Sequence, residues 1–202
     1  MPLRLGVFGG SFNPIHFGHL LAADDVKRQL RLDRMVFIPS CRPPHKRGPL
    51  TPYRLRLEMT RLAIEGIPGF KICPIEERRP GPSYTVDTLC ELRSLFPGSG
   101  LYLVVGSDQY RDVASWHRPD LLTELARIVV MSRPGVERPP LFPGHVPKRV
   151  LFRSIIPVGI SAAAIRARLA KGRSVRYMLP VSVAEYVTRY RLYRGPRTRR
   201  TA

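Results

Sequence analysis

The sequence is poor in cysteine and has no long hydrophobic run. Its cysteines, Cys41, Cys73 and Cys90, are odd in number and far apart, with no CxxC pair and no metal-ligand spacing. Reduced thiols in a cytoplasmic protein are the simplest interpretation. No apolar stretch reaches membrane-spanning length, and the N-terminus has no signal-peptide core. We therefore expect a cytoplasmic protein without a membrane partner.

Acidic residues are also scarce. The chain has 202 residues, with 34 Lys and Arg against 15 Asp and Glu, a net charge of +19. This charge favours anionic partners such as nucleic acid, a membrane surface or phosphorylated small molecules, although a solvated basic surface fits equally well. There is no helix-turn-helix pattern and no basic strand interleaved with aromatics, so nucleic-acid binding is the disfavoured alternative. Residues 194–202 are expected to form a disordered basic tail.

Apolar segments that are typical of strands alternate with segments of helical periodicity. The predicted strands are Leu3–Phe8, Arg34–Pro39, Phe70–Ile75, Leu101–Val105, Arg127–Met131 and part of Val150–Val158. The predicted helices are His19–Leu30, one from Thr51-Pro52 with Leu55, Met59 and Leu62 inward, one that the segment Ser83–Thr88 opens and that runs to Leu95, Leu121–Ala126, Ala162–Lys171, and one from about Pro180 to about Tyr190. Alternation of this kind predicts an α/β fold, a Rossmann-like doubly wound parallel sheet with helices on both faces. Residues 1–193 are expected to form a single domain, with C-terminal helices from about residue 161.

A glycine-rich turn, GGSFNPIHFGH over residues 9–19, joins the first predicted strand to the first predicted helix. A helix N-terminus attracts anions, and Gly9 and Gly10 let phosphate approach the backbone. His16 and His19 are three residues apart, whereas the two-histidine zinc helix uses four with a glutamate between. Since no third ligand stands nearby, we expect phosphate contact and no metal site.

The same string resembles the histidine motif of the nucleotidyltransferase superfamily, which ends in x-Gly-His. Within that superfamily it is similar to bacterial nicotinate-nucleotide adenylyltransferases, which have Thr and Asp where this chain has Ser11 and Asn13. The resemblance implies transfer of AMP from ATP to nicotinate mononucleotide, giving deamido-NAD and pyrophosphate in NAD biosynthesis. It also implies Mg²⁺ carried with ATP and no tightly bound cofactor. The alternative is a sister adenylyltransferase acting on nicotinamide mononucleotide, pantetheine phosphate or a flavin nucleotide.

Two further motifs and a tryptophan lie on the side expected for the mononucleotide. By resemblance, Lys46 of the Pro43-Pro44-His45-Lys46 loop meets phosphate, although a loop lysine is usually just solvated. Thr85 is predicted to cap a helix, and the resemblance adds a contact with the mononucleotide. Trp116, the only tryptophan, lies in a polar segment, and the resemblance implies that its indole stacks on the pyridine ring.

Three motifs are assigned to the ATP side. Asp108 follows a buried strand and could hold ribose, magnesium or a proton. Arg133 emerges from another strand, where an exposed loop arginine is nearly as good an interpretation. In the Ile160–Arg166 segment the family usually has Ser and Thr in place of Ala162 and Ala163. Each lost hydroxyl would cost about 0.5–1.5 kcal/mol, too little to abolish the site.

The predicted site residues form three overlapping sets. Those expected to contact ATP are Gly9, Gly10, Ser11, Phe12, His16, His19, Gly106, Asp108, Arg133, Ile160, Ser161 and Arg166. Those expected to contact the mononucleotide are Asn13, Lys46, Thr85 and Trp116. The expected catalytic residues are His16, His19, Lys46 and Arg166. A homo-oligomer is compatible with the sequence.

Overall fold

The protein is built on a six-stranded sheet. The computed structural model describes residues 2–44, 48, 50–132 and 134–194. Its strands are β1 (Arg4–Gly10), β2 (Arg34–Pro39), β3 (Phe70–Ile72), β4 (Gly100–Gly106), β5 (Arg127–Ser132) and β6 (Val150–Ser154). Every pairing is parallel and the order is β3-β2-β1-β4-β5-β6. This is the doubly wound order that reverses between β1 and β4, which confirms the predicted fold class.

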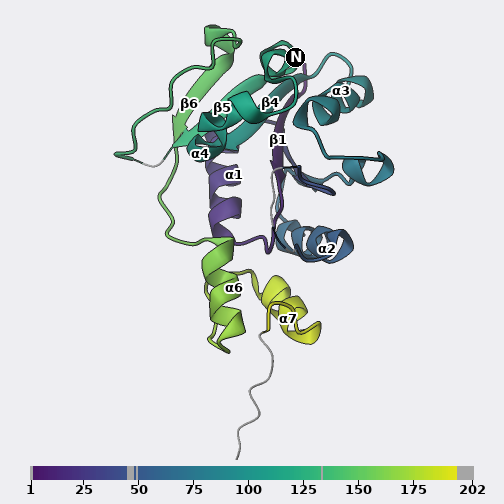
Figure 1. The fold of residues 1–202 in the computed structure, drawn as a ribbon, viewed down its shortest axis with the longest axis vertical. Helices are drawn as coiled ribbons and strands as arrows, with labels where there is room; N and C mark the ends of the chain where they lie inside the picture. The colour runs from purple at the N-terminus through teal and green to yellow at the C-terminus, as the bar shows by residue number, and fades with distance from the viewer. Residues whose placement is uncertain (1, 45–47, 49, 133, 195–202) are drawn as a thin grey trace, which may run out of the picture.

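Helices cover both faces of this sheet (Figure 1). They are α1 (Phe17–Gln29), α2 (Tyr53–Ile64), α3 (Thr85–Leu95), α4 (Ser107–Arg111), α5 (Leu122–Leu125), α6 (Ala162–Ala170) and α7 (Val181–Arg189). Short 3-10 helices are η1 (Ile75–Arg78), η2 (Val113–Ser115), η3 (Pro119–Leu121) and η4 (Pro147–Arg149). Buried side chains of α1, α2, α6 and α7 share one core, and those of α3, α4 and α5 share the other.

The strands are apolar throughout because both of their faces are buried. In β4, Leu101, Leu103 and Val105 enter the core beneath α3, whereas Tyr102 and Val104 enter the opposite core. Each fully buried aliphatic or aromatic side chain contributes about 1.5–3 kcal/mol. Alternate residues of one strand therefore bind both helical layers to the same sheet.

The two C-terminal helices lie at the end of the molecule to which the β1–α1 turn points, below α1 and α2 in Figure 1. Ile165, Val183 and Val187 are buried in the same core as α1 and α2. The Phe17 N–H donates to the Met178 carbonyl (3.2 Å). This packing supports our proposal that residues 1–193 form a single domain; the tail from residue 195 lies outside the described residues.

Three local predictions were wrong. The third strand ends at Ile72, because Pro74 has no N–H for the ladder and a 3-10 turn starts at Ile75. Thr51 is not a helix cap: Pro52 occupies that position before α2. Thr85 is the first residue of α3 and Tyr84 takes the cap position, so the capping role of Thr85 is also wrong.

In the described part of the chain, no helix has both the length and the hydrophobicity that crossing a membrane requires.

Candidate active site

A cavity of about 440 Å³ opens at the carboxyl ends of the strands, where the strand order reverses between β1 and β4. Crossover connections leave in opposite directions at such a point, so the turns there separate and form a crevice. The described residues that line it are Val7, Gly9, Gly10, Ser11, Ile38, Ser40, Pro43, Pro44, Glu76, Ser83, Tyr84, Thr85, Thr88, Leu103, Val104, Val105, Gln109, Asp112, Ser115, Trp116 and His117.

The end of β1 and the turn that follows it present backbone to this cavity. A Cβ placed on Gly9 would meet no described atom within 4 Å, so a ligand can approach this backbone closely. Phe12 has a positive φ of 41°, and its ring is buried edge-on against Phe8 (5.7 Å) and His19 (5.2 Å). The ring of Phe12 thus anchors the turn in the core, and the predicted ATP contact of this residue is limited to its backbone.

The two motif histidines contact each other at the start of α1. His16 is the N-cap residue and is buried, and its ring stacks on that of His19 at 3.8 Å between centroids. The His16 backbone N–H donates to His19 Nδ1 (3.3 Å), which places the proton of a neutral His19 on Nε2. His16 Nδ1 is buried and has no hydrogen-bond partner among the described residues.

Burial keeps both imidazoles uncharged at neutral pH. It lowers the pKa of His16 to about 4. It also lowers the pKa of His19 to about 3, with a smaller contribution from repulsion by His16. An approaching phosphate would raise both pKa values, because a nearby negative charge favours the protonated form. Neutral rings of this kind can offer hydrogen bonds without offering charge.

Gly18 lies between the histidine pair and the segment before α6. A Cβ on this residue would lie 3.0 Å from His16 Cε1 and Nδ1 and 3.4 Å from the Ile160 carbonyl oxygen. The glycine of His-x-Gly-His therefore serves close packing rather than an unusual backbone conformation, and a Cβ here would require the His16 ring to shift slightly. Ile160 thereby lies next to the histidine motif; its contact with ATP stays a prediction.

Arg166 reaches the β1–α1 turn from α6. Its Nη1 donates to the Asn13 carbonyl (2.8 Å). Ser161 caps α6 by accepting the Ala164 N–H (3.1 Å), as the sequence predicted. The buried Asn13 side chain accepts a hydrogen bond from the Tyr193 hydroxyl (2.7 Å). The Oδ1 of Asn13 is thus bound within the protein, on the C-terminal side, which disfavours its predicted contact with the mononucleotide.

Part of the cavity lining is an aromatic wall formed by Tyr84, Trp116 and His117. Trp116 is half-buried and lines the cavity, as does Thr85 at the start of α3. His117 stacks on Tyr84 at 4.2 Å between centroids. This stack connects the Trp116 segment to the N-terminus of α3. Tyr84 and His117 belong to this wall but were not predicted, because their sequence neighbours are polar loop residues.

Other predicted residues lie apart from this arrangement or outside the described chain. Asp108 is on α4, its side chain is 94% exposed, and it pairs with Arg111 (2.9 Å) instead of facing the described lining. Gly106 donates its N–H to Gln109 Oε1 (3.1 Å) at the rim. Lys46 and Arg133 lie outside the described residues. No group of His, Cys, Asp or Glu side chains within the described ranges could hold a metal ion.

The sequence matches one family model. This model, described as cytidylyltransferase-like, matches residues 7–168, a range that includes the β1–α1 turn, the aromatic wall and Arg166. The chain therefore belongs to the cytidylyltransferase-like family.

Curated relatives show which group within this family the chain belongs to. A probable nicotinate-nucleotide adenylyltransferase of Thermus thermophilus is 48% identical, with 95% of this chain and 100% of the relative covered. One from Thermomicrobium roseum is 44% identical, with 95% and 92% covered. Within the class, the chain belongs to the nicotinate-nucleotide adenylyltransferases.

Solved structures share the fold. A Plasmodium falciparum nicotinic acid mononucleotide adenylyltransferase complexed with NaAD superposes with a TM-score of 0.75 at 20% identity, over 95% of this chain and 97% of that one. The same enzyme complexed with APC gives a TM-score of 0.73. These likenesses support the doubly wound architecture.

The low pKa values of His16 and His19 predict a loss of stability in acid. An unfolded histidine has a pKa near 6.5, so below that pH the unfolded chain binds protons that the folded site excludes. The contribution of the two neutral histidines to the free energy of unfolding is complete above that pH. Below it, each histidine lowers the free energy of unfolding by about 1.4 kcal/mol per pH unit. We expect the free energy of unfolding, measured with urea, to fall between about pH 7 and about pH 5.5. The fall should be smaller in His16→Asn than in the wild type, because the variant lacks one of the two histidines but retains a side chain that can cap the helix. Equal drops in the two proteins would contradict this assignment.

Crowding at Gly18 predicts a local defect. Gly18→Ala should improve helix propensity by about 1 kcal/mol but displace the His16 ring or the Ile160 backbone. We expect calorimetry to show about 10-fold weaker ATP binding, with the melting temperature almost unchanged. Gly159→Ala is the matched control, because its Cβ would enter open space. Equal ATP affinity in the two variants would show that the packing of Gly18 is unimportant.

Proposed function

We propose that this protein transfers the adenylyl group of ATP to nicotinate mononucleotide, giving deamido-NAD and pyrophosphate in NAD biosynthesis. One observation carries the proposal: a single cavity joins the glycine turn and an aromatic wall, so two nucleotides can meet end to end in it. Full-length relatives named nicotinate-nucleotide adenylyltransferase support the same reaction.

The chemistry is a direct in-line transfer. A phosphate oxygen of the mononucleotide forms a bond to the α-phosphorus of ATP. The bond from that phosphorus to the oxygen bridging the β-phosphate breaks, and pyrophosphate leaves with the electron pair. The reaction balances without an enzyme-bound intermediate, so the protein contributes positioning and stabilisation of charge.

The ATP side is assigned to the β1–α1 turn and the start of α6. Backbone N–H groups of Gly9, Gly10 and Ser11, together with the N-terminus of α6, suit the triphosphate. His16 and His19 donate hydrogen bonds from neutral rings and gain charge as the phosphates bind. Mg²⁺ enters as part of the substrate MgATP.

Arginine and lysine supply the fixed positive charge in this proposal. Arg166 uses one Nη on Asn13, and its other N–H groups are assigned to the β- and γ-phosphates. Lys46, proposed by resemblance alone, would meet the charge that develops on the transferred group. Gly106, Asp108 and Arg133 keep an adenylate-side assignment only as expectations, and Asp108 would have to leave its pair with Arg111.

The aromatic wall is assigned to the mononucleotide. An electron-poor pyridinium ring suits the indole face of Trp116, and Thr85 lines the same cavity. Pantetheine phosphate has no aromatic ring, so this wall favours a ring-bearing substrate over that alternative. Three free cysteines are compatible with our expectation of a cytoplasmic enzyme.

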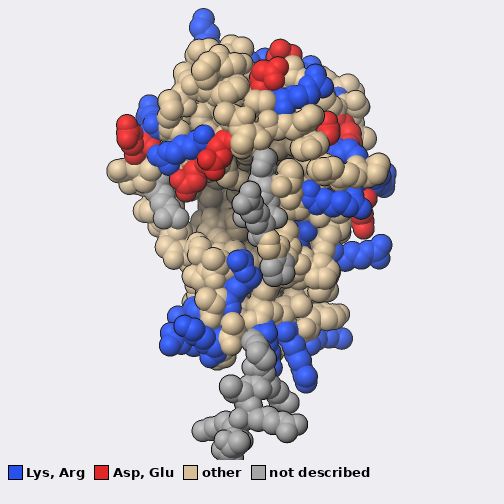
Figure 2. Space-filling model, in the orientation of Figure 1, with Lys and Arg blue, Asp and Glu red and all other residues tan. Residues whose placement is uncertain are grey.

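The basic surface is the observation that favours the second candidate, nucleic-acid binding. Figure 2 shows Lys and Arg side chains over the end formed by α6 and α7, with no acidic side chain visible there. A charged end of this kind also attracts anionic nucleotides toward the cavity. We therefore retain the adenylyltransferase as the main proposal.

A pyrophosphate-release assay separates these functions. We expect turnover with ATP and nicotinate mononucleotide to exceed turnover with nicotinamide mononucleotide, pantetheine phosphate or flavin mononucleotide. A higher rate with one of the other acceptors would identify a sister enzyme instead. Salt-sensitive retention on DNA, with no turnover of any acceptor, would favour nucleic-acid binding.

Trp116 predicts a substrate-specific defect. Trp116→Ala should raise KM for the mononucleotide about 10-fold through lost stacking and leave KM for ATP within about 2-fold. Trp116→Phe is the matched variant and should recover part of the affinity. Equal loss for both substrates would indicate a folding defect and not a stacking platform.

A further inference from the structure

Two buried residues of opposite charge contact the backbone of Cys41, in the segment that follows β2. The Cys41 N–H donates to Glu76 Oε2 (3.0 Å), and Arg56 Nη2 makes a longer contact with the Cys41 carbonyl (3.5 Å). Arg56 comes from α2 and Glu76 from η1. Neither residue was among the predicted site residues, because both occur in charged runs that are typical of a solvated surface.

Arg56 is 1% exposed and binds backbone oxygens from three segments. Its Nη1 donates to the Ser11 carbonyl (2.8 Å) and its Nε to the Thr51 carbonyl (2.8 Å), in addition to the contact with Cys41. Burial lowers the pKa of this guanidinium from its ordinary value. Its environment is therefore costly for a cation, and the carbonyl dipoles compensate for lost water. Arg56 ties the β1–α1 turn directly to α2.

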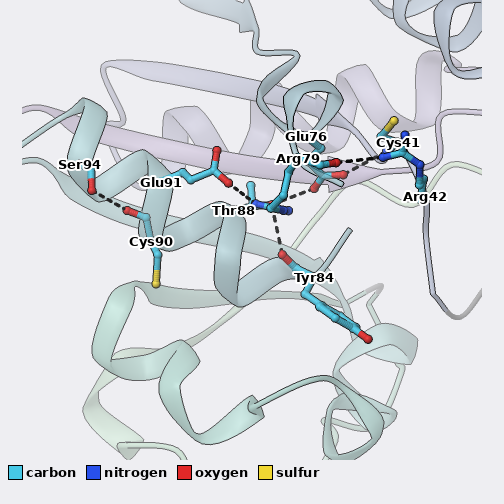
Figure 3. A network of polar contacts seen from close by, with 9 residues as sticks. All are labelled: Cys41, Arg42, Glu76, Arg79, Tyr84, Thr88, Cys90, Glu91 and Ser94. Carbon is cyan, nitrogen blue, oxygen red and sulfur yellow. Dashed lines mark hydrogen bonds and ion pairs between the residues drawn. The ribbon is translucent and has the colours of Figure 1, made fainter. Parts of the chain in front are cut away.

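Glu76 is 7% exposed and lines the cavity. Besides the Cys41 N–H it accepts the Thr88 hydroxyl (2.9 Å). Thr88 accepts from Arg79 Nη2 (3.1 Å), and Arg79 pairs with Glu91. Figure 3 shows Glu76 between the Cys41 backbone and this α3 network. Glu76 thus fixes the segment after β2 relative to the first turns of α3.

The segment Ser40–Arg42 lies in space between Glu76 and Arg56, and each of its three residues donates its backbone N–H to a partner. Ser40 donates its N–H to the Gly10 carbonyl (2.8 Å), Cys41 to Glu76, and Arg42 to Ser83 Oγ (2.9 Å). Directly after it, Pro43 and Pro44 line the cavity. These contacts set the spacing between the phosphate turn and the wall assigned to the mononucleotide.

We propose that Arg56 and Glu76 are positioning residues for the transfer reaction: they hold the Ser40–Arg42 segment between the β1–α1 turn and α3, and so align the two nucleotide sites. Only the expected effect on kcat rests on the proposed function. The restraint on Cys41 is a property of the folded protein and can be measured without turnover.

The kinetic test uses neighbouring residues of the same chemistry. Arg54 and Glu77 are exposed and pair loosely with each other at 3.6 Å, so Arg54→Lys and Glu77→Gln are matched controls. Arg56→Lys removes the planar fork, and Glu76→Gln leaves one acceptor oxygen for two donors. We expect kcat to fall about 10-fold or more in the two buried variants and KM for both nucleotides to stay within about 2-fold. Both controls should retain the wild-type kcat.

The second readout is the thiol of Cys41, labelled with a disulfide reagent in a Cys73→Ala, Cys90→Ala background. We expect labelling about 5-fold faster in Glu76→Gln and Arg56→Lys than in Arg54→Lys or Glu77→Gln. Unchanged kcat in both buried variants, or faster labelling in the controls as well, would overturn the proposal. If the wild type transfers no adenylyl group, the proposed function fails, and the labelling rates alone show whether Arg56 and Glu76 restrain the segment around Cys41. Should Arg56→Lys not fold, Glu76→Gln decides both readouts.

Discussion

The carbonyl groups of the β1–α1 turn are held by two arginines from distant parts of the chain. Arg56 of α2 donates to the Ser11 carbonyl, and Arg166 of α6 donates to the Asn13 carbonyl, each at 2.8 Å. With its carbonyls engaged on these sides, the turn presents Gly9, Gly10 and Ser11 to the cavity. The β1–α1 turn, α2 and α6 therefore depend on one another.

The electrostatics of the site follow from burial. The stacked His16 and His19 are neutral at physiological pH, so the turn avoids two adjacent cations. Arg166 has one Nη committed to Asn13, and helix N-termini contribute partial charge. In the proposed reaction, charge on the histidines appears together with the phosphates that stabilise it. Because the two imidazoles carry no charge until an anion binds, the free-energy cost of desolvating them in the folded protein is limited.

The alternation of strands and helices, the β1–α1 turn and the Ser161 cap could be predicted from sequence, since each depends on neighbouring residues. Contacts between distant segments could not. In α2 the predicted inward stripe was Leu55, Met59 and Leu62, yet Arg56 is more buried than either leucine, because three backbone oxygens surround it. Resemblance to the family motif suggested a ligand contact for Asn13, whereas Tyr193 binds its side chain. The roles of Lys46 and Arg133 stay predictions.

The bond between Tyr193 and Asn13 spans 180 positions of the chain. Domains generally fold as units, and the core beside α1 and α2 also includes Ile165, Val183 and Val187 of the two C-terminal helices. A nascent chain that has reached only β6 therefore lacks this part of the core and also lacks the contacts of Arg166 and Tyr193 with the β1–α1 turn. The same C-terminal segments thus complete both the hydrophobic core and the candidate nucleotide site.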